Sequence, residues 1–161
     1  MKKHTLTVTV ENKPGVLTRV TTLFRRRGYN IESLAVGETE NPTISRITII
    51  VRGDDRILEQ VTKQLYKLVD VIKIVDITEE RSVERELVLI KVKADNNVRA
   101  DIVQIVDIFR ARIVDIGKNS LIIEVTGDSS KIDAMVESLR PFGIIELVRT
   151  GIVAMVRGEI K

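Results

Sequence analysis

Hydrophobic and polar residues alternate with a period of two at the start of the chain, where Leu6, Val8 and Val10 are separated by threonines. That pattern predicts a strand with one buried face. From Val16 to Phe24 the apolar residues recur three and four positions apart, which predicts an amphipathic helix. The pattern that follows predicts strands over residues 30–36, 44–52 and 71–77, and a helix with an apolar stripe over residues 58–68.

The same order of elements repeats in the second half of the chain. Each half has the order βαββαβ of the ferredoxin-like split unit, so we expect an α+β protein made of two tandem ferredoxin-like βαββαβ domains. The polar residues between the halves indicate domains at 1–78 and 87–161, joined by a linker at 79–86. In the second half, the pattern predicts strands over 87–93, 113–116, 121–125 and a last one over 144–148, with helices over 102–109 and 132–139.

Composition narrows the class of protein. Of the 161 residues, 43% are hydrophobic and 30% are charged, as in globular domains. The chain has no cysteine, which excludes disulfides and thiol catalysis and fits a cytoplasmic location. The apolar runs have the length of strands and the first residues lack a signal-peptide core, so we expect no membrane segment. The net charge of +3 is spread evenly and gives little support for nucleic-acid binding.

Two helices can cover only one face of a four-stranded sheet, which leaves the other face and both edge strands open. Units of about 75 residues also have small hydrophobic cores. Pairing of sheet edges between two copies would address both problems. We therefore expect an obligate oligomer, a homodimer formed through the sheet edges.

The stretch Asn12-Lys13-Pro14-Gly15-Val16-Leu17 lies between the first predicted strand and the first predicted helix. With a glycine at this turn, the N–H groups of residues 15–17 would be free to hold a carboxylate. The Asn12 amide could accept a hydrogen bond from an ammonium group or donate one to a carboxylate. The alternative is an ordinary helix start, with Asn12 as the N-cap and Pro14 in the first turn.

Asn30 follows Gly28 and precedes the second predicted strand. It either closes the same pocket, within the chain or across a dimer, or it is a turn asparagine that tolerates a positive φ.

Candidate catalytic groups are scarce. His4 is the only histidine, and so close to the terminus we expect it to be solvent-exposed rather than catalytic. Without cysteine and with one histidine, transition-metal sites of the usual ligands are nearly excluded. The carboxylate pairs Asp54-Asp55 and Glu79-Glu80 fall at a helix start, where Asp54 is a candidate N-cap, and in the linker. We expect no catalytic residue and no metal site.

The basic run Arg25-Arg26-Arg27 invites a nucleic-acid interpretation, but it ends the first predicted helix, where cations complement the helix dipole. RNA-binding βαββαβ domains also stack bases on aromatic residues of their sheet. No predicted strand here has an interior aromatic residue, because the phenylalanines lie on helix stripes or in a turn. These patterns argue against RNA binding.

Several segments together resemble the ACT domain family and, more closely, the small regulatory subunit of acetolactate (acetohydroxyacid) synthase. The resemblance covers essentially the whole chain, and its motifs are specific in combination. The segments are residues 11–17 (ENKPGVL), 24–34 (FRRRGYNIESL), 58–71 (LEQVTKQLYKLVDV), 83–87 (VEREL) and 149–151 (RTG).

This resemblance implies a non-catalytic subunit that activates a separate catalytic large subunit in branched-chain amino acid biosynthesis and confers feedback inhibition by valine. The large subunit would carry thiamine diphosphate, Mg²⁺ and FAD, whereas this chain would carry no cofactor and would bind L-valine as its effector. ACT domains of the family pair side by side, with the effector at their interface. Mapped onto this sequence, one protomer would supply Asn12, Gly15, Val16 and Leu17, and the facing strand would supply Asn30 and Ile31.

Two other functions remain as alternatives. A stand-alone amino-acid-sensing ACT protein that regulates transcription would need a helix-turn-helix or ribbon reader, for which the predicted elements leave no room at either terminus. An enzyme in its own right would turn over substrates with thiamine diphosphate in isolation, and we expect no turnover.

Overall fold

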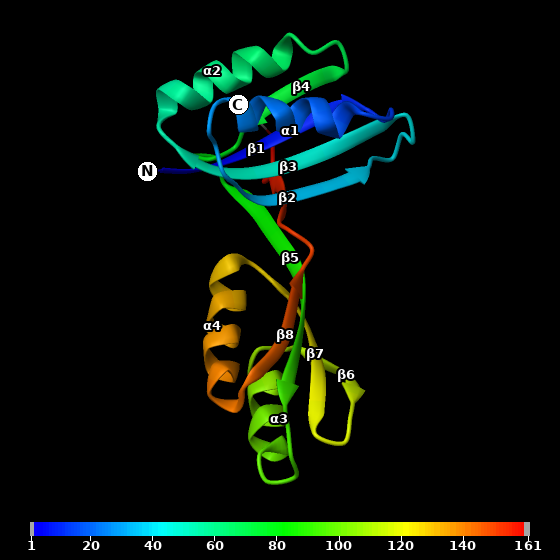
Figure 1. Ribbon diagram of the computed structural model, residues 1–161, viewed down its shortest axis with the longest axis vertical. Coiled ribbons are helices and arrows are strands. Elements are labelled where there is room, and N and C mark those ends of the chain that lie inside the picture. The colour runs from blue at the N-terminus through cyan, green and yellow to red at the C-terminus, as the bar shows by residue number, and fades with distance from the viewer. Residues whose placement is uncertain (1, 160–161) are drawn as a thin grey trace. The chain divides into compact units, whose positions relative to one another are not determined.

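A computed structural model describes residues 2–159 of the chain. They form two compact units (Figure 1). The first unit combines the chain up to residue 83 with the segment from residue 152, and the second spans residues 84–151. Each unit pairs one sheet with two α-helices, which confirms the predicted tandem of ferredoxin-like folds. No helix among residues 2–159 is long and apolar enough to cross a membrane.

The first unit contains a four-stranded sheet with the order β2-β3-β1-β4. Strand β1 pairs antiparallel with β3, so that Leu6 lies opposite Ile49, and β2 and β4 are the edges. The strands are β1 (Lys2–Glu11), β2 (Ile31–Glu38), β3 (Ile44–Gly53) and β4 (Val71–Asp76), and the helices are α1 (Val16–Arg26) and α2 (Asp55–Tyr66).

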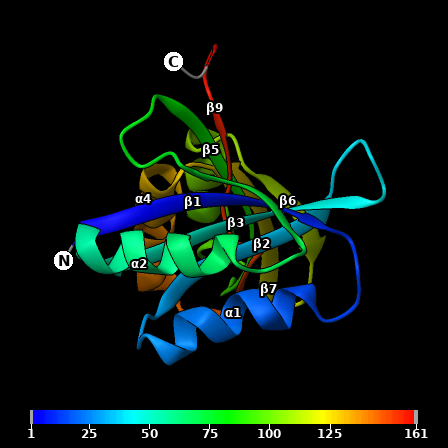
Figure 2. The same ribbon diagram turned by 90° about the horizontal axis from the view of Figure 1, so that it is seen from above.

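Helices α1 and α2 lie side by side on one face of this sheet (Figure 2). The alternating residues Leu6, Val8 and Val10 of β1 are at most 2% exposed, as the period-two pattern predicts. Phe24 of α1 and Leu65 of α2 are buried against them. Val16 and Phe24 lie near the two ends of α1 and are both buried in this core, so the helix has a fixed position relative to the sheet.

The opposite face of the first sheet is covered by the end of the chain. Ile152 donates its backbone N–H to the Ser33 hydroxyl at 2.9 Å, and Arg46 donates to the Ala154 carbonyl at 2.7 Å. Strand β9 (Val153–Val156) lies in this segment. From the sequence we predicted one domain over residues 87–161, with its last strand over residues 144–148. In the structure the segment from residue 152 instead belongs to the first unit, where it bonds to Ser33 of β2 and Arg46 of β3.

His4 is buried, with 1% of its surface exposed, and the expectation that it is solvent-exposed is wrong. The alternation of β1 puts position 4 on the helix-facing side of the sheet together with Leu6. Its Nε2–H donates to the carbonyl of Gly53 at 3.1 Å. His4 therefore joins β1 to the end of β3.

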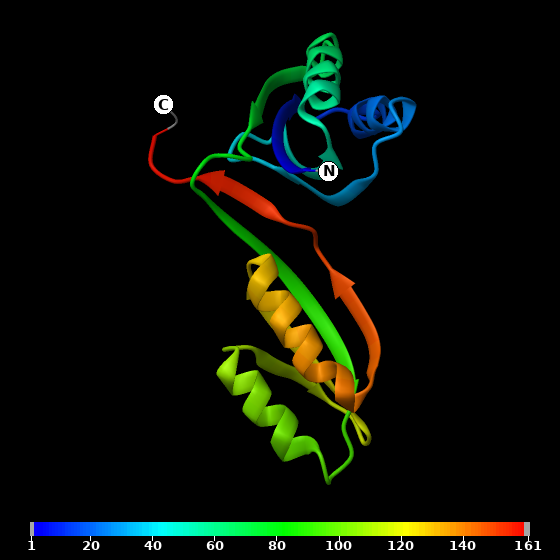
Figure 3. The ribbon, with the colours of Figure 1, turned by 90° about the vertical axis from the view of Figure 1, so that its left-hand side faces the viewer.

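The second unit repeats the arrangement with the sheet order β6-β7-β5-β8. Helices α3 and α4 lie on the same side of this sheet (Figure 3). Apolar residues of both helices and of alternate strand positions form its core, as in the first unit. The strands are β5 (Ser82–Lys93), β6 (Arg112–Ile116), β7 (Ser120–Gly127) and β8 (Ile144–Arg149), and the helices are α3 (Arg99–Ile108), α4 (Ser129–Leu139) and a 3₁₀ turn (Arg140–Phe142).

Residues 82–86, which the sequence assigned to a linker, already belong to β5. These residues are polar and lack a period-two pattern, so the sequence did not predict a strand there. Glu86 is 4% exposed, and Arg149 of β8 pairs with its carboxylate at 3.3 Å. A carboxylate can occupy a buried strand position in place of an apolar side chain when a cation pairs with it.

Candidate functional site

The start of α1 is an open helix terminus. Gly15 precedes the helix with a φ of +82°, a conformation that glycine adopts without strain, and no side chain caps the helix. The Val16 N–H makes only a long bond of 3.4 Å to Lys13, and among residues 2–159 the N–H groups of Leu17 and Thr18 have no acceptor. These donors point out of the helix end, where they can hold an anion.

Helices α2 and α4 begin differently. The Asp54 carboxylate accepts a hydrogen bond from the Ile57 N–H at 2.8 Å, which confirms Asp54 as an N-cap. Asp128 accepts in the same way from the Lys131 N–H at 2.9 Å. An aspartate at a helix start occupies the donors and repels other anions. The starts of α2 and α4 are therefore occupied, whereas α1 and α3 both begin without a side-chain cap and only α1 is preceded by a glycine.

Asn12 does not cap α1, so that alternative is wrong, and Pro14 lies before the helix rather than in its first turn. The Asn12 amide N–H₂ instead donates to the Glu38 carboxylate at 3.1 Å and to the Pro42 carbonyl at 3.0 Å. These bonds fix the end of β1 to the hairpin between β2 and β3. They also leave the amide oxygen of Asn12 free to accept a hydrogen bond, since no donor in the described chain binds it.

Arg19 adds a positive charge to this helix start, and the sequence reasoning missed it. A Cβ atom added to Gly15 would lie 3.2 Å from Nη1 of Arg19, so the guanidinium lies directly beside the glycine. Asp70, which is 15% exposed, pairs with the same guanidinium. The available signal was the spacing: a residue four positions after Gly15 lies on the same side of a helix, one turn further on.

Val16 and Leu17 have different environments. The Val16 side chain is 3% exposed and packs into the core, so only its backbone faces the helix start. The Leu17 side chain is 40% exposed. Leu17 can therefore contribute an apolar wall as well as a free N–H group.

Asn30 and Ile31 lie beyond the other end of α1. They line a shallow pocket of about 470 Å³ whose floor includes Phe24 and Tyr29. Helix α1 has 11 residues and is therefore about 16 Å long. Within one chain, the structure brings Asn12, Gly15 and Leu17 together but does not bring Asn30 and Ile31 to them.

Tyr29 forms a fixed part of that second pocket. Its ring packs on Gly53, where an added Cβ would lie 2.3 Å from the ring carbon Cε1. Burial raises the pKa of the Tyr29 hydroxyl, and the negative charge of Asp54 raises it further. The Tyr29 hydroxyl stays protonated at neutral pH, and the charged residue that lines this pocket is Arg25.

The described residues contain no group of three or more His, Asp or Glu side chains placed to hold a metal ion. The polar groups that converge at the start of α1 are backbone donors, one guanidinium and one amide oxygen. This set is suited to binding an amino acid, with its carboxylate and its ammonium group.

A ferredoxin-like unit with an open helix start after its first strand, followed by a second such unit, defines a tandem protein with an ACT-type first domain. A family model described as an AHAS small subunit-like ACT domain matches residues 6–73. A second model, described as the small subunit of acetolactate synthase, matches residues 85–158. The chain belongs to the family of acetolactate synthase small subunits.

Individual relatives agree with this assignment. A probable acetolactate synthase small subunit from Archaeoglobus fulgidus is 60% identical over 159 residues, which is 99% of each chain. The corresponding protein of Methanothermobacter thermautotrophicus is 58% identical over 157 residues, 97% of this chain and 94% of that one. The crystal structure of the acetolactate synthase small subunit from Thermotoga maritima matches with a TM-score of 0.90 at 45% identity, covering 99% of this chain and 100% of that one.

Proposed function

We propose that this chain is the non-catalytic regulatory subunit of an acetolactate synthase. It activates the catalytic large subunit, which carries thiamine diphosphate, Mg²⁺ and FAD, and it confers feedback inhibition by L-valine in branched-chain amino acid biosynthesis. The observation that carries the proposal is the uncapped start of α1 in an ACT domain of this family, with free N–H groups beside the Arg19 guanidinium.

Each group of valine has a complement at this helix start. The carboxylate binds the N–H groups of Leu17 and Thr18 and is neutralised by Arg19. The ammonium group donates to the free amide oxygen of Asn12. The branched side chain needs an apolar wall, part of which Leu17 supplies. The rest of that wall comes from a second copy of the chain.

Pairing of two copies through β2 supplies the missing side of the site. The end of β2 lies beside the start of α1 because Glu38 accepts a hydrogen bond from Asn12. If two β2 edges pair antiparallel about a twofold axis, the start of one strand lies beside the end of the other. Asn30 and Ile31 of one copy then approach Asn12 and Leu17 of the other.

The edge strand supports this pairing. β2 has no partner strand on its outer side within the described chain, and Val36 on it is 47% exposed. An unpaired edge with exposed apolar side chains favours strand pairing with another copy. A site shared by two copies also explains how valine acts as a regulator. It stabilises one packing of the dimer over another, with a coupling free energy of about 1–3 kcal/mol.

The test is reconstitution with the purified catalytic large subunit and measurement of the rate of acetolactate formation. We expect the chain to raise this rate, L-valine to reverse the increase, and D-valine at the same concentration to have little effect. Absence of both stimulation and valine inhibition would refute the proposal. Valine binding without stimulation would favour a stand-alone amino-acid-sensing protein, and turnover by the isolated chain would favour an enzyme.

A further inference from the structure

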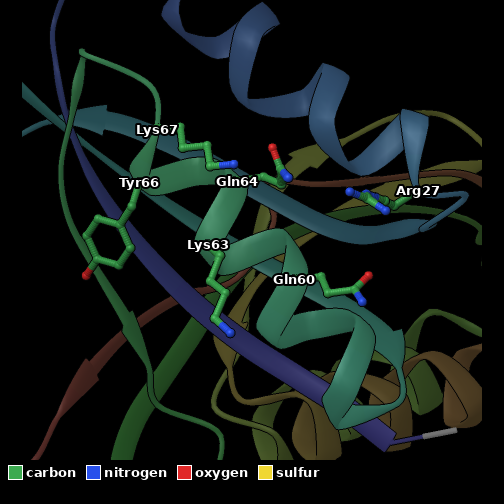
Figure 4. Close-up of a pocket in the computed structure, with 6 residues that line it drawn as sticks. All are labelled: Arg27, Gln60, Lys63, Gln64, Tyr66 and Lys67. Atoms are coloured by element: carbon green, nitrogen blue, oxygen red, sulfur yellow. The ribbon is translucent and has the colours of Figure 1, made fainter.

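Two residues of the basic run at the end of α1, Arg26 and Arg27, line a groove that the proposed valine site does not use. Arg26 and Arg27 face two adjoining pockets between α1 and α2, with volumes of about 240 and 610 Å³. The pockets share Arg27 and Gln64, and we call them together the interhelical groove. In Figure 4 the Arg27 side chain reaches from the end of α1 toward Gln64 on α2. The larger pocket is lined by Arg27, Gln60, Lys63, Gln64, Tyr66 and Lys67.

The interhelical groove is positively charged. No acidic residue lines either pocket. Within residues 2–159, Arg26, Arg27 and Lys67 form no ion pair. The fourth cation, Lys63, is partly neutralised because Glu59 pairs with it at 2.9 Å, and that hydrogen bond lowers the pKa of Glu59. Three positive charges from two helices therefore face one groove without counter-ions.

The remaining lining is suited to a small organic ligand. Gln60 and Gln64 point their amides into the groove region, and neither amide has a hydrogen-bond partner in the described part of the chain. Leu23 and Val61 form an apolar floor in the smaller pocket, and the exposed ring of Tyr66 adds an apolar wall to the larger. Tyr66 is held in place because its hydroxyl bonds both the N–H and the carbonyl of Ile74.

We propose that the interhelical groove binds a small molecule that carries one or more phosphate groups. Arginine guanidinium groups bind phosphate oxygens in a bidentate geometry, and the three charges of Arg26, Arg27 and Lys67 match a phosphate monoester or polyphosphate better than a single carboxylate. The groove has the volume of a small-molecule site rather than of an extended polymer surface. The cations outweigh the unfavourable dipole at the end of α1, which acts over about one turn.

The test is calorimetric titration of inorganic pyrophosphate into the purified full-length chain at an ionic strength of about 50 mM, where exposed charges are weakly screened. We expect saturable binding that weakens about tenfold in Arg27→Gln and again in Arg27→Gln/Lys67→Gln. The matched control is Arg56→Gln, which removes the same charge from an exposed position of α2 outside the groove. The control should bind within about twofold of wild type.

Three results would overturn the proposal. The wild type could bind no pyrophosphate, or Arg56→Gln could weaken binding as much as Arg27→Gln, which would show diffuse surface charge. A single-stranded oligonucleotide could bind more tightly than pyrophosphate and be lost in the same groove variants, which would show a nucleic-acid surface instead. The site is independent of the valine site, so a Gly15→Asp variant should keep full pyrophosphate binding whether or not valine regulates the protein.

Discussion

The two units share one fold but connect the turn after their first strand to the neighbouring hairpin with different side chains. In the second unit, Arg99 fills this turn: its guanidinium donates to the carbonyls of Ala94 at 3.2 Å, Gly117 at 2.5 Å and Lys118 at 2.8 Å. In the first unit, Asn12 makes the corresponding connection to the hairpin through Pro42. A shorter side chain makes that connection in the first unit, and in both units the helix that follows begins without a side-chain cap.

The two helix starts differ instead in the residue that precedes them, which is Gly15 before α1 and Val98 before α3. The arginine of the second unit closes its turn with charge-assisted bonds. The asparagine of the first unit holds the hairpin with one amide group, and the Arg19 guanidinium lies beside Gly15 at the helix start. The fold supplies the helix start in both units, and the side chains around it decide whether it is a site.

The largest effect is expected for Gly15→Asp. A non-glycine residue at a φ of +82° is strained, its Cβ would lie 3.2 Å from Arg19, and its carboxylate would occupy the helix start. We predict loss of valine inhibition with stimulation retained, measured in the reconstituted synthase. The control is Gly158→Asp, which adds the same charge at a φ of +65° with nothing within 4 Å of the new Cβ. If Gly15→Asp stayed fully valine-sensitive, the assignment of the site would be wrong.

Arg99→Ala should have the next largest effect, on stability alone. It removes three hydrogen bonds from a charged donor, so we predict that the second unit is destabilised by about 2 kcal/mol. Urea denaturation would measure the loss, and valine inhibition of the reconstituted synthase should be unchanged. Arg112→Ala, at an exposed position of β6, is the control and should leave the midpoint nearly unchanged. A loss of valine response in Arg99→Ala would contradict the separation of roles between the units.

Asn12→Ala should weaken valine binding about tenfold, equivalent to roughly 1.4 kcal/mol, because the ammonium group loses its acceptor. Calorimetric titration of L-valine would measure this. The control is Asn96→Ala, an exposed asparagine in the equivalent turn of the second unit. Equal valine affinity in Asn12→Ala and Asn96→Ala would exclude Asn12 from the site.

Arg19 and Asp70 should give small effects of opposite sign. Arg19→Gln removes the cation beside Gly15 and should weaken valine binding a few-fold, the usual size for a partly exposed charge. Asp70→Asn releases the guanidinium from its ion pair and should tighten binding about twofold. Both changes in valine affinity should become smaller at high salt, because salt screens the charges. Titrations that gave the same sign for both variants would show that Arg19 does not act on the carboxylate.

Local patterns were sufficient to predict much of this molecule. Period-two alternation predicted β1 and its buried face, and Asp54 was recognised as an N-cap because cap residues act within one turn. The turn at Gly15 was recognised for the same reason. Each of these features depends on residues that are close together in the sequence.

Features that depend on distant residues were not predicted. His4 is buried because β1 continues to Lys2 and pairs there with Gly53, which no local pattern reveals. Strand β9 is only four residues long, and the hydrogen bonds that join its segment to β2 and β3 connect residues that are far apart in the sequence. The partners of Asn12 lie on a hairpin about 30 residues away, so the sequence left its role open between a cap and a ligand-binding group.

The most direct test of the shared valine site is a mixed dimer. A heterodimer of Gly15→Asp and Asn30→Ala chains, purified through two different affinity tags, contains one intact site if Gly15 of one copy faces Asn30 of the other. At a valine concentration at which neither variant homodimer binds, we predict that this heterodimer binds about half as much valine as the wild-type dimer, with wild-type affinity. A heterodimer that binds no valine would show that the two chains do not complete each other's site.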